Sequence, residues 1–232
     1  SINMGDKLFT ELRTGIAYLL NGNVSKALIH VNKSNVLIKE GGLNLIKNKI
    51  NRNYTANFAY FLSRLCPQLK KTSDNFAMKK IAHIGESHCL SFAYESINLS
   101  SVSKYIQPIL ISGAKAYHFS DKGNNKWKSS FEEQIKKLKS INEVFISFGE
   151  IDCRKDEGIL VYSKKYNLDI EEVCKKTING FLDYIELQLS QRFSRRYYFG
   201  IPAPIASHKS LDDDDFKKVL SSIWHDCKQI YC

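Results

Sequence analysis

Residues 80–92 are Lys80-Ile81-Ala82-His83-Ile84-Gly85-Glu86-Ser87-His88-Cys89-Leu90-Ser91-Phe92. Ile81 to Ile84 are typical of a short buried strand that ends at Gly85, and the apolar run from Cys89 to Ile97 predicts a helix. Ser87 is therefore expected at the carboxyl end of a strand and at a helix N-terminus, where free N–H groups favour negative charge. In open α/β sheets such strand ends hold the functional site. A second interpretation stays open, in which Ser87 only caps the helix.

Two more strand ends follow the same design. Glu143–Phe148 is a short apolar strand that runs into Gly149-Glu150-Ile151-Asp152-Cys153-Arg154, and Tyr197–Ile201 runs into Pro202-Ala203-Pro204. The strand at 106–111, the helices at 127–138 and 170–189, an irregular segment at 155–167 and a last helix at 216–230 complete the expected elements. Strands that alternate with helices indicate an α/β fold with a parallel sheet.

From about Lys79 to Pro204 the chain resembles the SGNH (GDSL-type) hydrolase family. Gly85-Glu86-Ser87-His88 is similar to the first block of the family, usually Gly-Asp-Ser, and Ile111-Ser112-Gly113-Ala114 is similar to the second. Gly149-Glu150-Ile151-Asp152 lies where the third block, Gly-x-Asn-Asp, belongs. The resemblance implies a three-layer α/β sandwich with a central parallel sheet, of the flavodoxin-like kind.

The resemblance also implies hydrolysis of an acyl ester. Ser87 would attack the carbonyl carbon, and the backbone N–H groups of Ser87 and Gly113 would hold the oxyanion. Asp152 takes the place of the Asn that adds a side-chain donor in the family, and its carboxylate would repel an oxyanion unless protonated or turned away. Arg154 could pair with Asp152 and restore positive character, so we interpret Gly-Glu-Ile-Asp-Cys-Arg as the signature of a bacterial subgroup.

The catalytic base is the larger departure from the family, whose last block is Asp-x-x-His. No histidine has an aspartate three residues before it; the six are His30, His83, His88, His118, His208 and His225. Either the missing block lies beyond Cys232, or the base is recruited elsewhere, with His208 the best substitute by position. His88 adjoins Ser87, and since adjacent side chains usually point apart, capping or packing is the expected role. We interpret His225 as a helix-surface residue, and His30 and His83 as structural.

A basic helical region precedes the α/β domain. Apolar residues recur at helical spacing over residues 5–66, with breaks at Asn21-Gly22-Asn23 and Gly41-Gly42. Residues 1–80 hold 13 Lys/Arg against 4 Asp/Glu, whereas residues 81–232 hold 21 against 20. This asymmetry predicts a helical region over residues 1–75 and an SGNH-like domain over residues 76–232. The basic surface could meet an anionic partner, namely a membrane surface, an acidic glycan or nucleic acid, or simply be a solvated face. The lysines are scattered, without a specific nucleic-acid motif.

Composition narrows the class of protein further. No apolar run approaches the roughly 20 residues of a membrane-spanning helix, and the first residues lack the pattern of a signal peptide, so a cytoplasmic location is expected. The six cysteines show no zinc-binding spacing and are expected to be reduced thiols, with Cys89 and Cys153 as packing residues. Asp212–Asp215 could bind a cation, but a charge run at a helix N-terminus explains them more simply. No metal and no organic cofactor is predicted.

These observations lead to one leading hypothesis and two rivals. The leading hypothesis is a serine esterase or deacylase of SGNH type that acts on an acyl ester, O-acetyl included, of a small molecule or a carbohydrate. The first rival is a catalytically incomplete SGNH-like domain that binds a glycan or a protein. The second makes the helical region an adaptor that docks the domain to a larger assembly. The sequence implicates Ser87 and His208 in catalysis, and Gly113, Asp152 and Arg154 around the oxyanion.

Overall fold

The computed structural model describes residues 3–69, 78–99 and 101–199, which form two compact units. The first unit contains the chain up to Lys79 together with Ser91–Gln107, and the second contains Lys80–Leu90 and the residues from Pro108 onward. This division differs from the predicted boundary near residues 75–80, because residues 91–107 group with the helical unit. The last predicted helix and His208 lie outside the described residues.

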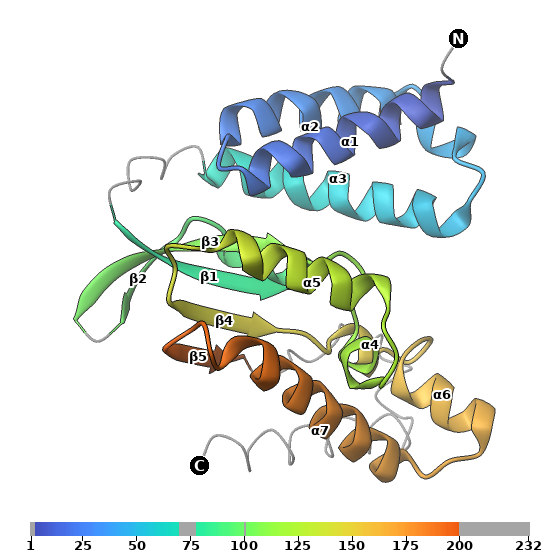
Figure 1. Ribbon diagram of the computed structural model, residues 1–232. Coiled ribbons are helices and arrows are strands. Elements are labelled where there is room, and N and C mark those ends of the chain that lie inside the picture. The colour runs from blue at the N-terminus through green and yellow to red at the C-terminus, as the bar shows by residue number, and fades with distance from the viewer. Residues whose placement is uncertain (1–2, 70–77, 100, 200–232) are drawn as a thin grey trace. The chain divides into compact units, whose positions relative to one another are not determined.

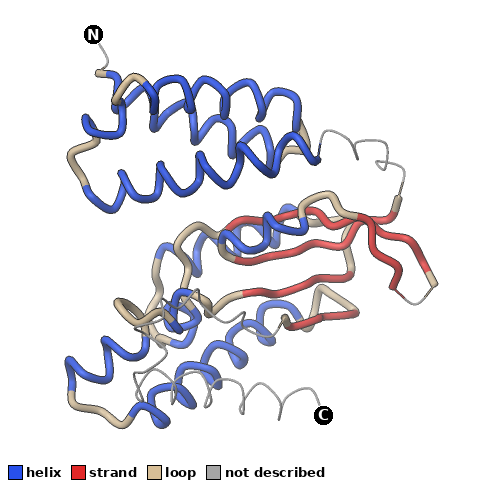
Figure 2. The backbone as a smooth tube through the Cα atoms, turned by 180° about the vertical axis from the view of Figure 1, so that it is seen from behind, coloured by secondary structure: helices blue, strands red, loops and turns tan. Residues whose placement is uncertain are grey.

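Three α-helices build most of the first unit, as the periodicity predicts. They lie side by side and alternate in direction (Figures 1 and 2). Their bounds are Met4–Leu20 for α1, Val24–Lys39 for α2 and Lys49–Leu69 for α3, with a 3-10 helix η1 at Gly42–Leu45. The side-chain oxygens of Asn3 and Asn23 accept hydrogen bonds from the N–H groups of Asp6 and Lys26, each at 3.0 Å, and so begin α1 and α2.

The core of this unit comes from the apolar stripes of the three helices. Leu8, Leu12 and Leu19 of α1, Ala27 of α2 and Leu62 of α3 are all fully buried. Burial of such a stripe is the main source of stability for helices of this length, because isolated helices are marginal in water.

A β-hairpin completes the first unit and corrects one sequence prediction. The helix expected over residues 89–97 is wrong: a 3-10 helix, η2, covers Ser87–Phe92, and strand β2 follows at Ser96–Leu99. β2 pairs antiparallel with β3, Val102–Leu110. Exposed and half-buried side chains alternate along β2. This two-residue period is that of a strand, and it differs from the helical spacing that was expected from the sequence. The Tyr94 hydroxyl donates a hydrogen bond to the Leu19 carbonyl, which ties the segment before the hairpin to α1.

The sheet has five strands in the order β2-β3-β1-β4-β5. β1 is Lys79–Gly85, β4 is Glu143–Ser147 and β5 is Arg195–Tyr198. The pairs β1–β4 and β4–β5 are parallel, as predicted, with Gly85 opposite Ser147 and Ile146 opposite Tyr198. Because β2 is antiparallel to β3, the sheet is mixed, and the predicted central parallel sheet does not extend to that edge.

Helices of the second unit cover one face of the sheet. They are α4 at Ala116–Ser120, α5 at Lys126–Lys137 and α7 at Ile170–Leu189. Phe119, Phe131 and Ile185 from these helices share one core with Ile84 of β1 and Ile146 of β4. Figures 1 and 2 show α5 and α7 on the same side of these strands. The described residues therefore form an α/β unit with a layer of helices on this face.

The segment predicted to be irregular at 155–167 contains a further helix. α6 spans Ile159–Tyr166 and packs its buried Ile159 and Leu160 against Cys174 of α7. Gly158 precedes the helix with φ 80°, and Asn167 ends it in the left-handed conformation with φ 51°. Four of its apolar and aromatic residues stand together at 159–162, and eight residues span only about two turns, so the segment shows no helical spacing and sequence reasoning missed the helix.

The opposite side of β1 and β4 carries an aromatic cluster around a buried histidine. His83 is 1% exposed, lies against the rings of Phe145 and Phe199, and places Nε2 2.8 Å from the hydroxyl oxygen of Ser147. Burial lowers the pKa of His83 to about 4. The interpretation of His83 as structural is consistent with this position between two strands.

His83 gives the fold a predictable response to acid. Below the unfolded pKa of 6.5 the unfolded chain binds a proton at His83, whereas the folded chain binds it only near pH 4. The free energy of unfolding is therefore expected to fall as the pH drops from 6.5 to 4, by up to about 3 kcal/mol from this residue. Denaturant unfolding of the wild type and of His83→Gln across that range measures the effect. Parallel pH profiles for the two proteins would refute it.

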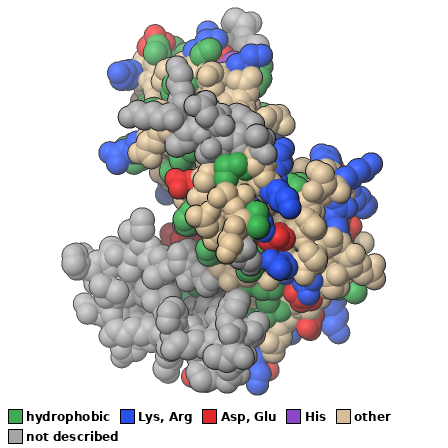
Figure 3. Space-filling model, turned by 90° about the vertical axis from the view of Figure 1, so that its left-hand side faces the viewer, with side chains coloured by type: hydrophobic (Ala, Val, Ile, Leu, Met, Phe, Trp, Pro, Cys, Tyr) green, Lys and Arg blue, Asp and Glu red, His purple; other side chains and the backbone are tan. Residues whose placement is uncertain are grey.

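Two surface properties bear on partners. Lys and Arg side chains occur at several separate places in Figure 3, in keeping with their scatter along the sequence. Within the described ranges, no helix combines the length and the apolar character that crossing a bilayer requires.

Candidate functional site

The structure brings together the two strand ends that the sequence singled out. β1 and β4 are adjacent and parallel, and the N–H of Glu86 donates to the carbonyl of Ser147 at 3.3 Å. Gly85 permits this approach, since a Cβ at that position would lie 2.3 Å from Oγ of Ser147 and 2.5 Å from its carbonyl oxygen. The carboxyl ends of both strands therefore open at one edge of the sheet, where α/β proteins place their sites.

Ser87 is the first residue beyond this edge that carries a nucleophile. It is half-buried and opens η2, whose first turn is closed by the hydrogen bond from Cys89 N–H to the Glu86 carbonyl at 3.0 Å. A 3-10 helix of six residues sums few peptide dipoles, so its N-terminus attracts negative charge less than the predicted long helix would. Ser87 thus lies at a strand end, as predicted, but the short helix that it begins has a much smaller dipole than the predicted long helix.

A buried pair of glutamates joins the two motifs. Glu86 and Glu150 are 2% and 7% exposed, and Oε1 of Glu86 accepts the backbone N–H of Glu150 at 2.9 Å. Burial, followed by the nearby charge of Glu150, raises the pKa of Glu86 to about 8. Glu86 is therefore largely protonated at neutral pH, although the hydrogen bond from Glu150 N–H and the charge of Arg154 favour its carboxylate form.

Arg154 compensates the charge of Glu150, not that of Asp152. Its Nη2 lies 2.7 Å from Oε2 of Glu150, and its Nε lies 3.1 Å from each oxygen of the same carboxylate. Nη1 bonds Glu157 at 2.9 Å, and Glu157 also meets Lys115 Nζ at 3.2 Å. Within the described residues, Arg154 therefore pairs with Glu150 and Glu157, and the suggested pair with Asp152 is not formed. The i,i+4 spacing of Glu150 and Arg154 was the sequence signal for the actual pair.

Asp152 has a structural partner of its own. Its Oδ2 accepts the N–H of Ala116 at 2.7 Å and its Oδ1 accepts the N–H of Tyr117 at 3.2 Å, which satisfies the first turn of α4. Asp152 is only 1% exposed, and this burial raises its pKa to about 6. The two hydrogen bonds and the charge of Lys115 act in the opposite direction and lower the pKa. The carboxylate is thus turned toward α4. From the sequence, it was expected to be compatible with an oxyanion only if it is either protonated or turned away, and this orientation meets the second condition.

Gly113 lies in the turn that follows β3. It has φ 67°, is exposed, and has no atom within 4 Å of where a Cβ would stand. The turn starts beside the first motif, because Ile111 N–H donates to the Gly85 carbonyl at 2.8 Å. Gly113 therefore lies two residues beyond the contact with the β1 end, and its proposed role as an oxyanion donor stays a prediction.

The two cysteines of the motifs are packing residues, as predicted. Cys89 is fully buried and Cys153 is 2% exposed, and both are free thiols. Burial raises the pKa of each thiol, which keeps it protonated and unreactive.

Sequence reasoning missed one combination of residues. One ligand atom each from Glu86, His88 and Glu150 lies within 4.8 Å of the other two, a grouping that suits a metal ion. His88 was interpreted only in relation to its neighbour Ser87, from which its side chain was expected to point away. Its grouping with Glu86, two residues before it in the chain, was therefore not considered. A Glu-x-His sequence at one strand end with a Glu at the neighbouring end was the available signal.

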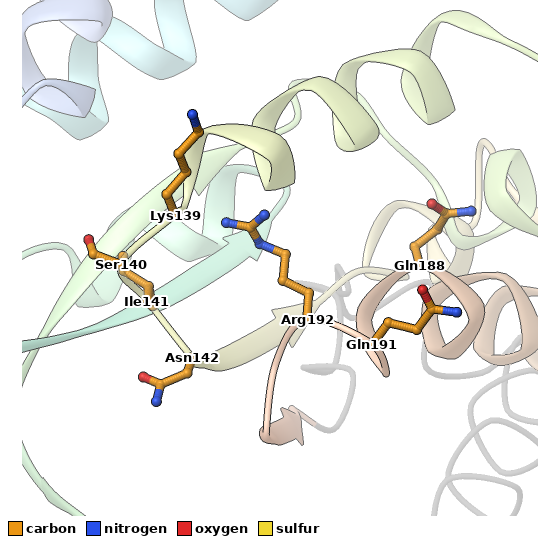
Figure 4. Close-up of a pocket in the computed structure, with 7 residues that line it drawn as sticks. All are labelled: Lys139, Ser140, Ile141, Asn142, Gln188, Gln191 and Arg192. Atoms are coloured by element: carbon orange, nitrogen blue, oxygen red, sulfur yellow. The ribbon is translucent and has the colours of Figure 1, made fainter.

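A separate hollow lies at the other end of β4. It has a volume of about 710 Å³ and is lined by Lys139, Ser140, Ile141, Asn142, Gln188, Gln191 and Arg192. Arg192 reaches from beyond the end of α7 toward the 139–142 loop (Figure 4). Since Asn142 precedes the first residue of β4, this hollow lies at the amino end of the strand, remote from the motifs at its carboxyl end.

Glu86, Glu150 and Asp152 thus form a buried cluster of ionisable groups at the carboxyl ends of β1 and β4, with the half-buried Arg154 and Ser87 beside it. No protein-family model, no curated protein and no solved structure matches the chain significantly.

Proposed function

We propose that the chain is a serine hydrolase of SGNH type that cleaves an acyl ester with Ser87 as its nucleophile. The observation that supports this most is the position of Ser87, half-buried directly beyond β1 and next to the β4 end and the β3 turn. Three strand ends of one sheet around a serine offer a nucleophile and backbone donors at the same edge. The proposal includes the three-layer arrangement of the family. The helices α4, α5 and α7 on one face of the sheet would be one of its two helical layers.

The proposed reaction proceeds in two steps. Oγ of Ser87 bonds to the ester carbon as a base removes its proton, and collapse of the tetrahedral intermediate breaks the bond to the alcohol, which takes that proton. Water then attacks the acyl-enzyme and releases the acid. The N–H groups of Ser87 and Gly113 are the proposed oxyanion donors, and His208 is the proposed base. His88 is the described histidine nearest to Ser87 in sequence, but the adjacent position suits it poorly to that role.

The proposed substrate class is an O-acylated carbohydrate or small molecule. No organic cofactor enters the two steps, because both use only a hydroxyl, a base and N–H donors. Of the proposed partners, an anionic one for the basic helices is supported by charge alone, since residues 1–80 carry 13 Lys/Arg against 4 Asp/Glu.

A non-catalytic binding domain is the second candidate, and one observation favours it. Both oxygens of Asp152 are engaged by α4, so the place where the family has an Asn supplies no side-chain donor. Loss of one oxyanion donor typically costs about 100-fold or more in turnover. The ligand would then be a glycan or a protein held at the same edge.

Intact-mass measurement after exposure to a fluorophosphonate tests the proposal. We expect one adduct on the wild-type chain and none on Ser87→Ala, because only an activated serine reacts. Ser91→Ala is the matched control, since Ser91 is an exposed serine in the same 3-10 helix. We also expect Ser87→Ala to lower turnover of a small acetyl ester more than about 1,000-fold. Unchanged turnover, or no adduct on the wild type, would favour the binding domain.

A further inference from the structure

The strongest unexplained feature of the second unit is the grouping of Glu86, His88 and Glu150. One ligand atom from each lies within 4.8 Å of the other two, and two come from the β1 end while the third comes from the β4 end. Residues 64 positions apart therefore converge on one point through the parallel pairing of the strands. The set combines one imidazole with two carboxylates.

Two polar atoms of this group are buried and accept or donate no hydrogen bond within the described residues. One is Oε2 of Glu86, a side chain that is only 2% exposed, and the other is Nδ1 of His88. A buried polar atom without a partner costs about 1–3 kcal/mol, so native proteins rarely leave two together. One ligand atom of each of these two side chains lies within 4.8 Å of one on the other, so a single species bound between the side chains would account for both unpaired atoms.

We propose that Glu86, His88 and Glu150 bind a divalent transition-metal ion, with Zn²⁺ as the representative. Imidazole nitrogen with carboxylate oxygen is the donor set that such ions prefer, whereas Mg²⁺ and Ca²⁺ prefer oxygen alone. With bonds of about 2.0–2.2 Å to each donor in tetrahedral geometry, an ion needs the three donor atoms about 3.4 Å from one another. Since the atoms lie within 4.8 Å of one another, the side chains have to approach one another by at most about 1.4 Å, which rotation of their χ angles can supply.

The ion pair of Glu150 with Arg154 is compatible with this site. Each carboxylate oxygen has two lone pairs, so Glu150 can accept from Arg154 and still ligate an ion. Arg154 is also held by Glu157 at 2.9 Å, and this second anchor keeps the guanidinium in place if Glu150 turns. An arginine bonded to a ligating carboxylate is the outer-shell contact that commonly orients metal ligands.

Three protein ligands leave coordination positions open beside Ser87. An ion there would act as a Lewis acid toward a bound carbonyl or water. The site itself does not depend on the proposed function, because Ser87 is not among its ligands. Metal binding without fluorophosphonate labelling would support the metal site and count against the hydrolase. Labelling without metal binding would do the reverse.

Binding of Zn²⁺ to the metal-free full chain, measured by titration calorimetry and by metal analysis after gel filtration, tests the site. We expect the wild type to bind one more tight equivalent than Glu86→Gln or His88→Gln, each of which should weaken that site at least about 100-fold. Glu133→Gln and His30→Gln are matched controls: Glu133 pairs with Lys137 on an exposed helix face, and His30 pairs with Glu11 in the helical unit. Thermal melting checks that each variant is folded. If Glu86→Gln does not fold, the result of His88→Gln, a change at a half-buried position, decides the test.

Co²⁺ provides the second readout, because its visible spectrum reports the donor atoms. We expect bands of a nitrogen and oxygen environment that disappear in His88→Gln and persist in both controls. Isotherms that Glu86→Gln and His88→Gln leave unchanged would overturn the proposal, and so would equal losses in the two controls.

Discussion

Gly158→Ala is expected to destabilise the second unit by about 3–5 kcal/mol, the sum of a backbone cost and a steric cost. Gly158 has φ 80° and ψ −146°, a conformation that is essentially restricted to glycine. A Cβ there would also lie 2.3 Å from the carbonyl oxygen of Asp152 and 2.6 Å from its carbonyl carbon. These are backbone atoms, so relief requires the segment that carries Asp152 to move.

The measurement is thermal and denaturant unfolding of the variant beside the wild type, with an expected drop of roughly 10 °C in Tm. Gly123→Ala is the matched control, since a Cβ there would meet only Asp121 Oδ2 at an ordinary 3.5 Å. The movement of Asp152 should also loosen the first turn of α4, whose N–H groups it accepts. Equal Tm values for the two glycine variants would contradict the described backbone at Gly158.

Arg154→Met is expected to cost about 2–3 kcal/mol at neutral pH, because it leaves the carboxylate of Glu150 without its cation. The Glu150 side chain is 8% exposed, and breaking a buried ion pair from one side typically costs 3–5 kcal/mol. The expected value lies lower because Arg154 is itself 39% exposed and water can partly replace it. Methionine preserves most of the aliphatic volume, so the change reports the lost charge and hydrogen bonds.

Arg196→Met separates this effect from the general loss of an arginine. Nε of Arg196 bonds both carboxylate oxygens of Glu186, at 3.0 and 3.1 Å, but Glu186 is 41% exposed, so the expected cost is below about 1 kcal/mol. Chemical denaturation of both variants at neutral pH gives the comparison. Equal losses would show that burial of Glu150 does not strengthen its pair with Arg154.

The sequence predicted those parts of the fold that depend on local pattern. Ile81–Ile84 and Glu143–Phe148 are compact apolar runs ended by glycine, and both are strands at the expected places. The long amphipathic helices α5 and α7 also agree with their predicted spans to within a residue. In each of these segments, the period of the apolar residues and the burial in the folded chain favour the same element.

The failures have physical causes of two kinds. Residues 89–97 are apolar enough for a helix, but pairing with Val102–Leu110, which a local pattern cannot show, makes part of them a strand. In the site, Arg154 has acidic residues on both sides in the sequence, and only the fold shows that Asp152 is already engaged by α4. The residue types for the grouping of His88 with Glu150 were visible in the sequence, but their convergence depends on strand pairing across 60 residues, which a local pattern does not show.

The parallel pairing of β1 with β4 has a consequence for the kinetics of folding. Glu86 and Glu150 meet only after the chain has closed a loop of more than 60 residues, because parallel strands require a crossover between them. Loop-closure entropy delays such non-local contacts relative to the local helices. The cluster beside Ser87 therefore belongs to the late-forming part of the unit, and a refolding chain acquires its helices before it acquires the site.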